Sequence, residues 1–176
     1  VMLVLEQGAV LKGSPRLEDY QSLKTTLDLS KYESGEGTVN YNSATDPEWS
    51  RSLIFAIDVH NAGICGEGTI DGDNVRNPKG EEHMRGPHTV LLAGCKDMSF
   101  CDFTVNHSAN YAFLAYKIEN TRYERIKING GWDGIHVRGA KRLHISNCNI
   151  HSGDDALAGG YWEKAQITNC TLNSSC

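Results

Sequence analysis

Residues 142–173 read RLHISNCNIHSGDDALAGGYWEKAQITNCTLN, and the pattern of the first ten residues returns 22 positions later. In both units, apolar or small residues occupy the second, fourth, seventh and ninth places: Leu143, Ile145, Cys148 and Ile150, then Ala165, Ile167, Cys170 and Leu172. Alternation of this kind is typical of a half-buried β-strand, and the step of three between the two pairs indicates a bend. Each unit is therefore predicted to form two short strands joined by a bend.

The same pattern occurs twice more upstream, in DMSFCDFTVN from residue 97 and in NTRYERIKIN from residue 120. Apolar spacings of three and four residues over a long run, which an α-helix would need, are missing. Strands this short cannot bury a face alone, whereas coiling stacks equivalent strands in parallel about 4.8 Å apart. The repeat predicts an all-β parallel β-helix with coils of about 22 residues, forming a single domain over residues 1–176.

Two stretches without the repeat interrupt it. Residues 12–50 are rich in charged residues, Gly and Ser, and residues 71–88 form a second irregular insertion. Insertions in a solenoid commonly line its working face. Because Val1 already lies in a strand-like pattern and the repeat runs to the last residues, we expect an internal part of a longer solenoid, cut at both ends. Uncapped end coils would favour end-to-end self-association.

Side chains at the same place of successive units should stack. The seventh place predicts an inward column that includes Cys148 and Cys170, and we expect both thiols to be reduced, because in-register side chains of parallel strands have poor geometry for a disulfide. The tenth place predicts a ladder of turn side chains that satisfies backbone groups between coils: Asn106, Asn129, His151 and Asn173.

The composition excludes several classes of partner. The chain carries 17 Lys and Arg residues against 22 Asp and Glu, a net charge of −5, without a basic block, which argues against nucleic acid. No run of eighteen apolar residues predicts a membrane span. His83, His88 and His107 lack the spacing of a metal site, and we expect them at the surface or in turns. No metal site or cofactor is predicted.

Three parts of the chain carry a family resemblance. They read GEGTIDG at 66–72, RGPHTVLLAGCKDMSF at 85–100, and WDGIHV followed by ISNCNIHSGDDALA at 132–137 and 145–158. They resemble glycoside hydrolase family 28, the polygalacturonase family. This resemblance implies a right-handed parallel β-helix that hydrolyses α-linked galacturonic acid bonds of pectic polysaccharide, with catalytic Asp133, Asp154 and Asp155. The family's later Gly-His-Gly and Arg-Ile-Lys coils would lie beyond Cys176, so we expect this chain alone to be weakly active or inactive.

The residues themselves favour acid–base chemistry. Asp133 and Asp155 are 22 residues apart, so the repeat predicts that they lie on neighbouring coils about 5 Å apart, with Asp154 adjacent. Three carboxylates this close cannot all ionise cheaply, so one should stay protonated and act as an acid while another acts as a base, as glycoside hydrolysis requires. The resemblance implies the inverting route, with Asp154 as general acid and Asp133 and Asp155 activating water.

Aromatic residues beside the aspartates are candidates for substrate binding, because their rings can stack on sugars. His136 is a further candidate, since strand alternation could direct it to the same cleft. The aromatic candidates are Trp132, Tyr161 and Trp162; for the last two, covering the end of the core is an equal alternative. The small residues nearby either leave room for a sugar or form tight turns: Gly153, Ala156 and Gly159.

Two other functions stay open at this point. A Ca²⁺-dependent enzyme like pectate lyase would use clustered aspartates to hold calcium on the same solenoid. A catalytically inactive carbohydrate-binding or structural β-helix would need no reactive group. For a pectin-directed hydrolase, the partner would be a pectic polysaccharide or oligosaccharide, and the protein would be secreted or periplasmic.

Overall fold

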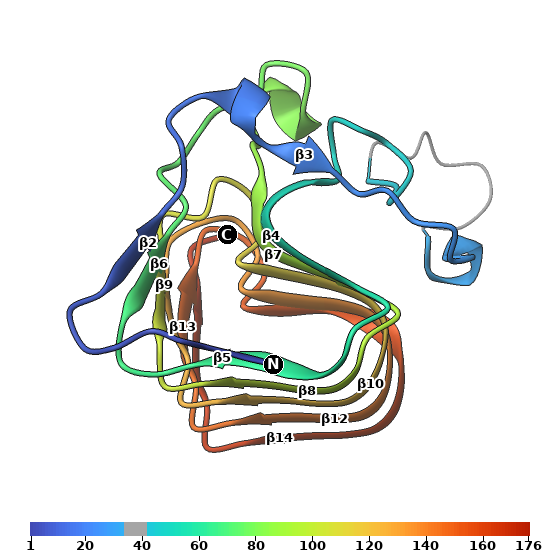
Figure 1. Cartoon of the computed structure of the whole chain (residues 1–176), viewed down its shortest axis with the longest axis vertical. Coiled ribbons are helices and arrows are strands. Elements are labelled where there is room, and N and C mark those ends of the chain that lie inside the picture. Colours follow the sequence, from blue (N-terminus) through green and yellow to red (C-terminus); the bar gives the residue numbers. More distant parts are fainter. Residues whose placement is uncertain (34–41) are drawn as a thin grey trace.

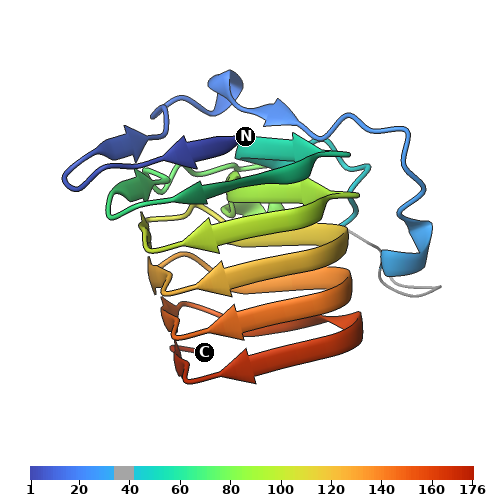
Figure 2. The same cartoon turned by 60° about the horizontal axis from the view of Figure 1, so that its bottom comes forward.

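The computed structural model describes residues 1–33 and 42–176, and its strands form a right-handed parallel β-helix, as predicted (Figure 1). Each coil has three faces. Figure 2 shows the coils stacked along one axis, from the end that carries the N-terminus to the end that carries the C-terminus. None of the helices in the described ranges is long and apolar enough to cross a membrane.

The three faces are formed by strands that recur in a fixed order along the chain. The first face contains β4 (Arg51–Ile57), β7 (His88–Ala93) and the first halves of β10 (Phe113–Glu124), β12 (Ile135–Ser146) and β14 (Leu157–Thr168). The second contains β1 (Met2–Val4), β5 (His60–Cys65), β8 (Lys96–Cys101) and the second halves of the same three strands. The third contains β2 (Val10–Lys12), β6 (Thr69–Asp71), β9 (Thr104–Asn106), β11 (Lys127–Asn129), β13 (Asn149–Ser152) and β15 (Thr171–Ser174).

The bends between faces are built from residues with positive φ, and these residues stack in columns. The bend from the second face to the third, between the fourth and seventh places of the repeat, was predicted from the sequence, whereas the bend from the first face to the second was not. Asn, Asp and Gly adopt this conformation most readily, whereas Lys and Tyr adopt it at a cost. The bend from the first face to the second carries Asp58, Gly94, Lys117, Gly139 and Tyr161, and the bend from the second face to the third carries Gly66, Asp102, Arg125, Asn147 and Asn169. A further column lies just inside the second-face strands: Asn61, Asp97, Asn120, Arg142 and Lys164.

Inward side chains fill the coil with one continuous apolar core. The rings of Phe100 and Tyr123 stack at a centroid distance of 5.2 Å, and Phe113 meets both edge-on. Cys148 is buried in this core and Cys170 packs against it, both as free thiols, as predicted. Burial raises the pKa of Cys148 to about 11.

One cysteine pair differs from the expectation about in-register thiols. Cys65 and Cys101 pair directly across β5 and β8 and form a disulfide with a Cα–Cα distance of 4.5 Å. They lie on the outer side of the coil, since the preceding residues Ile64 and Phe100 are buried. Each is the last residue of its strand, next to the bend at Gly66 and Asp102, so the regular ladder ends where the bridge forms.

Members of the predicted ladder contact one another, but they stand in β9, β11, β13 and β15 rather than in turns, and these contacts join side chains rather than backbone groups. Asn129 donates to the side-chain oxygen of Asn106 at 2.8 Å, and Asn173 lies 3.2 Å from Nδ1 of His151. These side chains are half-buried or exposed on the outside of the coil, because the residues before them point inward.

The two insertions contribute only short elements in their described parts. The first contains η1 (Leu17–Asp19), β3 (Gln21–Ser22), which pairs antiparallel with β4, and η2 (Ser30–Tyr32). The second contains η3 (Glu81–His83). Leu29, Ala44 and Trp49 of the first insertion bury the outer side of the first face, against Leu91, Leu114 and Tyr116. The first face is therefore packed on both sides, which explains why all of β7 is buried.

Candidate active site

The three candidate aspartates lie in the turns that lead from the third face to the first. Asp133 precedes β12, and Asp154 and Asp155 precede β14. The backbone N–H of Gly134 donates to the carbonyl of Asp155 at 2.9 Å, and that of Asp154 donates to the carbonyl of Trp132 at 3.0 Å. Asp155 therefore lies one coil from Asp133, in the register that the repeat predicted.

The small residues around the aspartate pair serve close packing between coils. A Cβ atom on Gly153 would lie 2.6 Å from the carbonyl oxygen of Gly131, and one on Gly159 would lie 1.8 Å from that of Val137. Gly159 also has a φ of +118°, and Ala156 is buried in the core. The alternative of tight turns holds for Gly153, whereas Gly159 lies inside β14 and is required by the close approach of β12.

Asp133 is buried and forms a pair with His136. Its Oδ2 lies 2.5 Å from Nδ1 of His136, and Nε of Arg138 lies 3.2 Å from Nε2 of the same ring. A guanidinium N–H only donates, so Nε2 of His136 must accept. Nδ1 therefore donates to the Asp133 carboxylate, which fixes the roles of the two ring nitrogens in this network.

A stacked aromatic residue fixes the orientation of this histidine. The rings of Tyr111 and His136 are 4.9 Å apart and tilted by only 5°. Tyr111 is one coil away from Asp133 in the column of the candidate aspartates, since β10 and β12 pair in register. Burial, followed by the charge of Asp133, raises the pKa of Tyr111, which keeps this phenol neutral.

Asp154 contacts a buried arginine that the sequence did not single out. Nη2 of Arg85 lies 3.1 Å from Oδ2 of Asp154, and its guanidinium lies over the ring of Trp132 at 4.1 Å from the centroid. Arg85 is 6% exposed and also contacts Glu81 and Glu82 of η3. Burial opposes its charge, but the three carboxylates raise its pKa above the ordinary value. The one sequence feature that could have pointed to Arg85 is its position at the start of RGPHTVLL, one of the stretches that carry the family resemblance.

Asp155 is exposed and lines a cavity of about 380 Å³ together with His136, Arg138 and Tyr161. Arg138, also missed from the sequence, is nearly buried: its Nη1 donates to the carbonyl of Asn42 at 2.7 Å and lies 3.8 Å from Glu33. The first insertion therefore closes one side of this cavity.

The predicted aromatic residues have different surroundings. Trp132 is half-buried under Arg85, and Tyr161 is 64% exposed at the rim of the Asp155 cavity. Trp162 packs against the core, and its Nε1 donates to the carbonyl of Val137 at 2.8 Å, so it lies apart from the aspartates. Of the three histidines expected at the surface or in turns, His88 is fully buried beneath Trp49 and Tyr111, and that expectation was wrong for it.

Within the described ranges, no three His, Cys, Asp or Glu side chains are arranged to hold a metal ion. The sequence Arg-Ile-Lys, which the family resemblance implies for a later coil, also occurs at residues 125–127. There it lies in a bend before the aspartates, where Arg125 pairs with Asp102 and Ile126 is buried.

Known proteins resemble this chain in sequence and in fold. A polygalacturonase from Juniperus ashei is 28% identical over 97 residues, which cover 52% of this chain and 18% of that protein. A structure from Parabacteroides merdae, assigned as a glycosyl hydrolase, aligns with a TM-score of 0.74 at 22% identity over 97% of this chain and 73% of its own. A polygalacturonase from Erwinia carotovora aligns with a TM-score of 0.71 at 17% identity, over 97% of this chain and 49% of its own.

This chain therefore matches less than a fifth of the length of the Juniperus relative and about half of the Erwinia enzyme. The two solved structures carry the same fold along nearly all of it. The family model described as glycosyl hydrolases family 28 matches residues 12–175, and the chain belongs to that family.

Proposed function

We propose that the protein is a glycoside hydrolase of pectic polysaccharide that cleaves α-linked galacturonic acid bonds with inversion. The single observation that carries this proposal is the stacking of Asp155 on Asp133 in neighbouring turns, with Asp154 beside them. Family membership and the polygalacturonase relative support the substrate class.

In the proposed reaction, Asp154 donates a proton to the leaving glycosidic oxygen. Asp133 and Asp155 bind a water molecule and remove its proton as it attacks the anomeric carbon from the opposite side. Arg85, 3.1 Å from Asp154, would stabilise the carboxylate that forms when the proton leaves. His136 would hold Asp133 in one rotamer, because its Nδ1–H donates to Oδ2 and leaves Oδ1 for the water.

The reaction is tested by measuring products from polygalacturonic acid with the complete natural protein. We expect new reducing ends in the presence of a chelator and no ultraviolet absorbance from unsaturated sugars. Asp154→Asn and Asp155→Asn should each lower kcat by about 10²–10⁴-fold, whereas Glu67→Gln, an exposed carboxylate in the early turn, should leave it unchanged. Absorbance that disappears with chelator would instead establish a lyase, and full activity of Asp154→Asn would refute the assignment.

The role of His136 is tested by two substitutions of different hydrogen-bonding capacity. His136→Asn keeps a donor near the position of Nδ1, whereas His136→Leu removes it. We expect the Leu variant to lose about 10-fold or more in kcat, with a smaller change in KM, and the Asn variant to recover most of the loss. Imidazole ¹⁵N shifts of the unmodified protein should show the Nδ1–H tautomer; the Nε2–H tautomer would contradict the assigned network.

We further propose that the protein is secreted or periplasmic, which the Cys65–Cys101 disulfide supports, because such bonds persist in oxidising compartments. Alkylation of the protein in its source cells should leave these two cysteines protected; modification of both would argue for a reducing compartment.

A further inference from the structure

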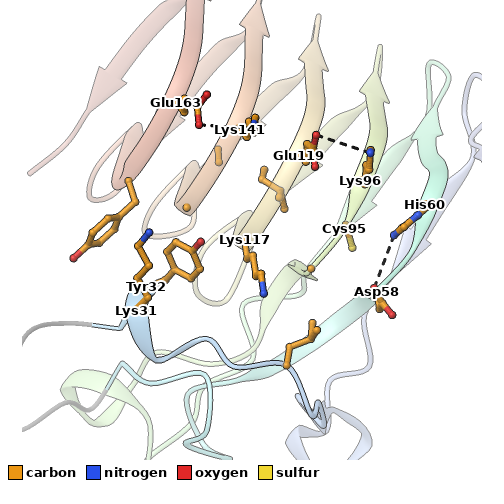
Figure 3. A pocket seen from close by; sticks show the side chains of 16 residues that line it. Lys31, Tyr32, Asp58, His60, Cys95, Lys96, Lys117, Glu119, Lys141 and Glu163 are labelled. Carbon is orange, nitrogen blue, oxygen red and sulfur yellow. Dashed lines mark ion pairs between the residues drawn. The ribbon is translucent and has the colours of Figure 1, made fainter.

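A second cavity shares Tyr32 and Tyr161 with the Asp155 cavity. It has a volume of about 480 Å³, within the range of small-molecule sites. One wall is the segment of residues 27–33 from the first insertion, and the other is the outer surface of β8, β10, β12 and β14 (Figure 3). We call this space the corner groove, because it follows the column of positive-φ residues that includes Gly94, Lys117 and Gly139.

The insertion segment is seated on this column by two glycines. A Cβ atom on Gly94 would lie 2.5 Å from Cδ1 of Leu27, and one on Gly139 would lie 2.4 Å from the ring of Tyr32. The side chains of the insertion therefore occupy the space that these glycines leave free. This packing holds the wall of the corner groove at a fixed distance from the strands.

The position between these glycines holds Lys117 rather than a third glycine. Lys117 has a φ of 51°, and Tyr161, further along the column, has a φ of 57°. A residue with a Cβ atom is strained in this region, and such strain is often retained at functional sites. Both strained residues line the corner groove. Glycine is thus used where the insertion packs, whereas residues with side chains occupy the column where the groove opens.

The ammonium groups of the corner groove are available to a ligand. Within the described part of the chain, neither Lys31 nor Lys117 has a carboxylate within 4.0 Å. Figure 3 shows Lys117 pointing into the groove from the strand side and Lys31 lying beside Tyr32 on the opposite wall. Nζ of Lys31 lies 5.7 Å from the ring centroid of Tyr32 and 6.0 Å from that of Tyr161, so this charge is already held near two aromatic rings.

Carboxylates alternate with further lysines along the strand wall. Register places Lys96, Glu119, Lys141 and Glu163 in one row across β8, β10, β12 and β14. The pairs Lys96–Glu119 and Lys141–Glu163 are 3.9 and 4.0 Å long and about half exposed, so each is weak and can exchange for a ligand contact. Glu119 also pairs with Arg142, which holds this carboxylate in the row. A polyphosphate would be repelled by these carboxylates, whereas a sugar can donate its hydroxyl groups to them.

We propose that the corner groove binds sugar units of an acidic saccharide, with ligand carboxylates on Lys31 and Lys117, hydroxyl groups on the Glu119 and Glu163 row, and a sugar face on Tyr161. Tyr32 and Tyr161 also line the Asp155 cavity, so one chain can extend from that cavity into the groove. The choice of a galacturonate chain rests on the proposed function, but binding is measured separately from hydrolysis.

The test is calorimetric titration of hexagalacturonate and digalacturonate into the chain of residues 1–176 carrying Asp154→Asn, which prevents turnover. In that background, Lys31→Gln with Lys117→Gln should weaken hexagalacturonate about tenfold, as expected for two partly exposed charge pairs, and leave digalacturonate unchanged. The matched control is Lys127→Gln, an exposed lysine on β11 of the third face. Fully methyl-esterified hexagalacturonate carries no carboxylate, so it should bind the double lysine variant and the Lys127→Gln control equally.

Equal affinity of the double variant and the control for hexagalacturonate would overturn the corner-groove assignment, while leaving the proposed hydrolysis intact. Tyr161→Ala provides a second measure, and it should weaken hexagalacturonate even if the lysine variant folds poorly. Conversely, hexagalacturonate binding that depends on both lysines, in a natural protein that releases no reducing ends, would refute the proposed hydrolysis and retain the groove.

Discussion

His88 and His136 lie close together, yet their surroundings assign them different roles. His88 has no exposed surface and packs edge-on against Trp49 at 4.7 Å, and its Nδ1 accepts the backbone N–H of Tyr111 at 3.2 Å. Burial, followed by the positive charge of Arg138, lowers the pKa of His88 to about 3. This histidine is therefore a neutral packing residue, whereas His136 contacts Asp133.

The buried His88 predicts an acid-sensitive stability. Above pH 6.5 both the folded and the unfolded protein hold it neutral, so its contribution does not change with pH. Between pH 6.5 and about 3 only the unfolded state takes the proton, so the free energy of unfolding falls as pH falls, by about 1.4 kcal/mol per unit. Urea denaturation at pH 6.5 and 5 should show a loss about 2 kcal/mol larger for the unmodified protein than for His88→Asn. An equal loss in both would show that His88 titrates normally.

At the scale of the element, each coil depends on three bends, and close contacts between coils restrict which residues can form them. A similar restriction acts inside the strands, because the carbonyl of Val137 on the preceding coil occupies the position of a Cβ atom on Gly159 of β14. The apolar period of the repeat revealed one bend of the three. The bend from the first face to the second was not visible, because Lys117 and Tyr161 stand among its glycines at positive φ and hide the pattern.

Adjacent glycines in β14 offer a matched test of this packing. Gly159→Ala should lower the free energy of unfolding by about 3 kcal/mol or more, because it combines a positive φ with a backbone collision. Gly160→Ala should change it by less than about 0.5 kcal/mol, since no atom lies within 4 Å of the added methyl group. Chemical denaturation of both variants measures the difference. Similar stability of the two would mean that the coils separate more easily than described.

At the scale of the molecule, the apolar columns reach the surface of the last described coil. Ile167 and Leu172 are 43% and 46% exposed, whereas Ile145 and Ile150 at the same places one coil earlier are buried. Among the described strands, β14 pairs only with β12, and β15 only with β13. Both backbone edges and apolar side chains are thus available to another molecule.

The chain of residues 1–176 should therefore self-associate end to end. Light scattering after size exclusion should give a mass that rises with protein concentration, and Ile167→Glu with Leu172→Glu should shift it toward the monomer. Met84→Glu, at a similarly exposed residue in the second insertion, is the control and should not. A monomer at every concentration would rule this association out.

The sequence by itself determined the β-helix, the inward columns and the stacking of Asp155 on Asp133, because the period of a solenoid decides which residues come into register. Only the tertiary structure decided which groups surround the aspartates. Arg85 meets Asp154 across 69 positions of sequence, and Arg138 meets Asn42 across 96. The insertions that supply Arg85 and Asn42 have no repeat, so their contacts depend on packing that no local period encodes. The same holds for His88, whose burial follows from Trp49 of the first insertion covering the first face.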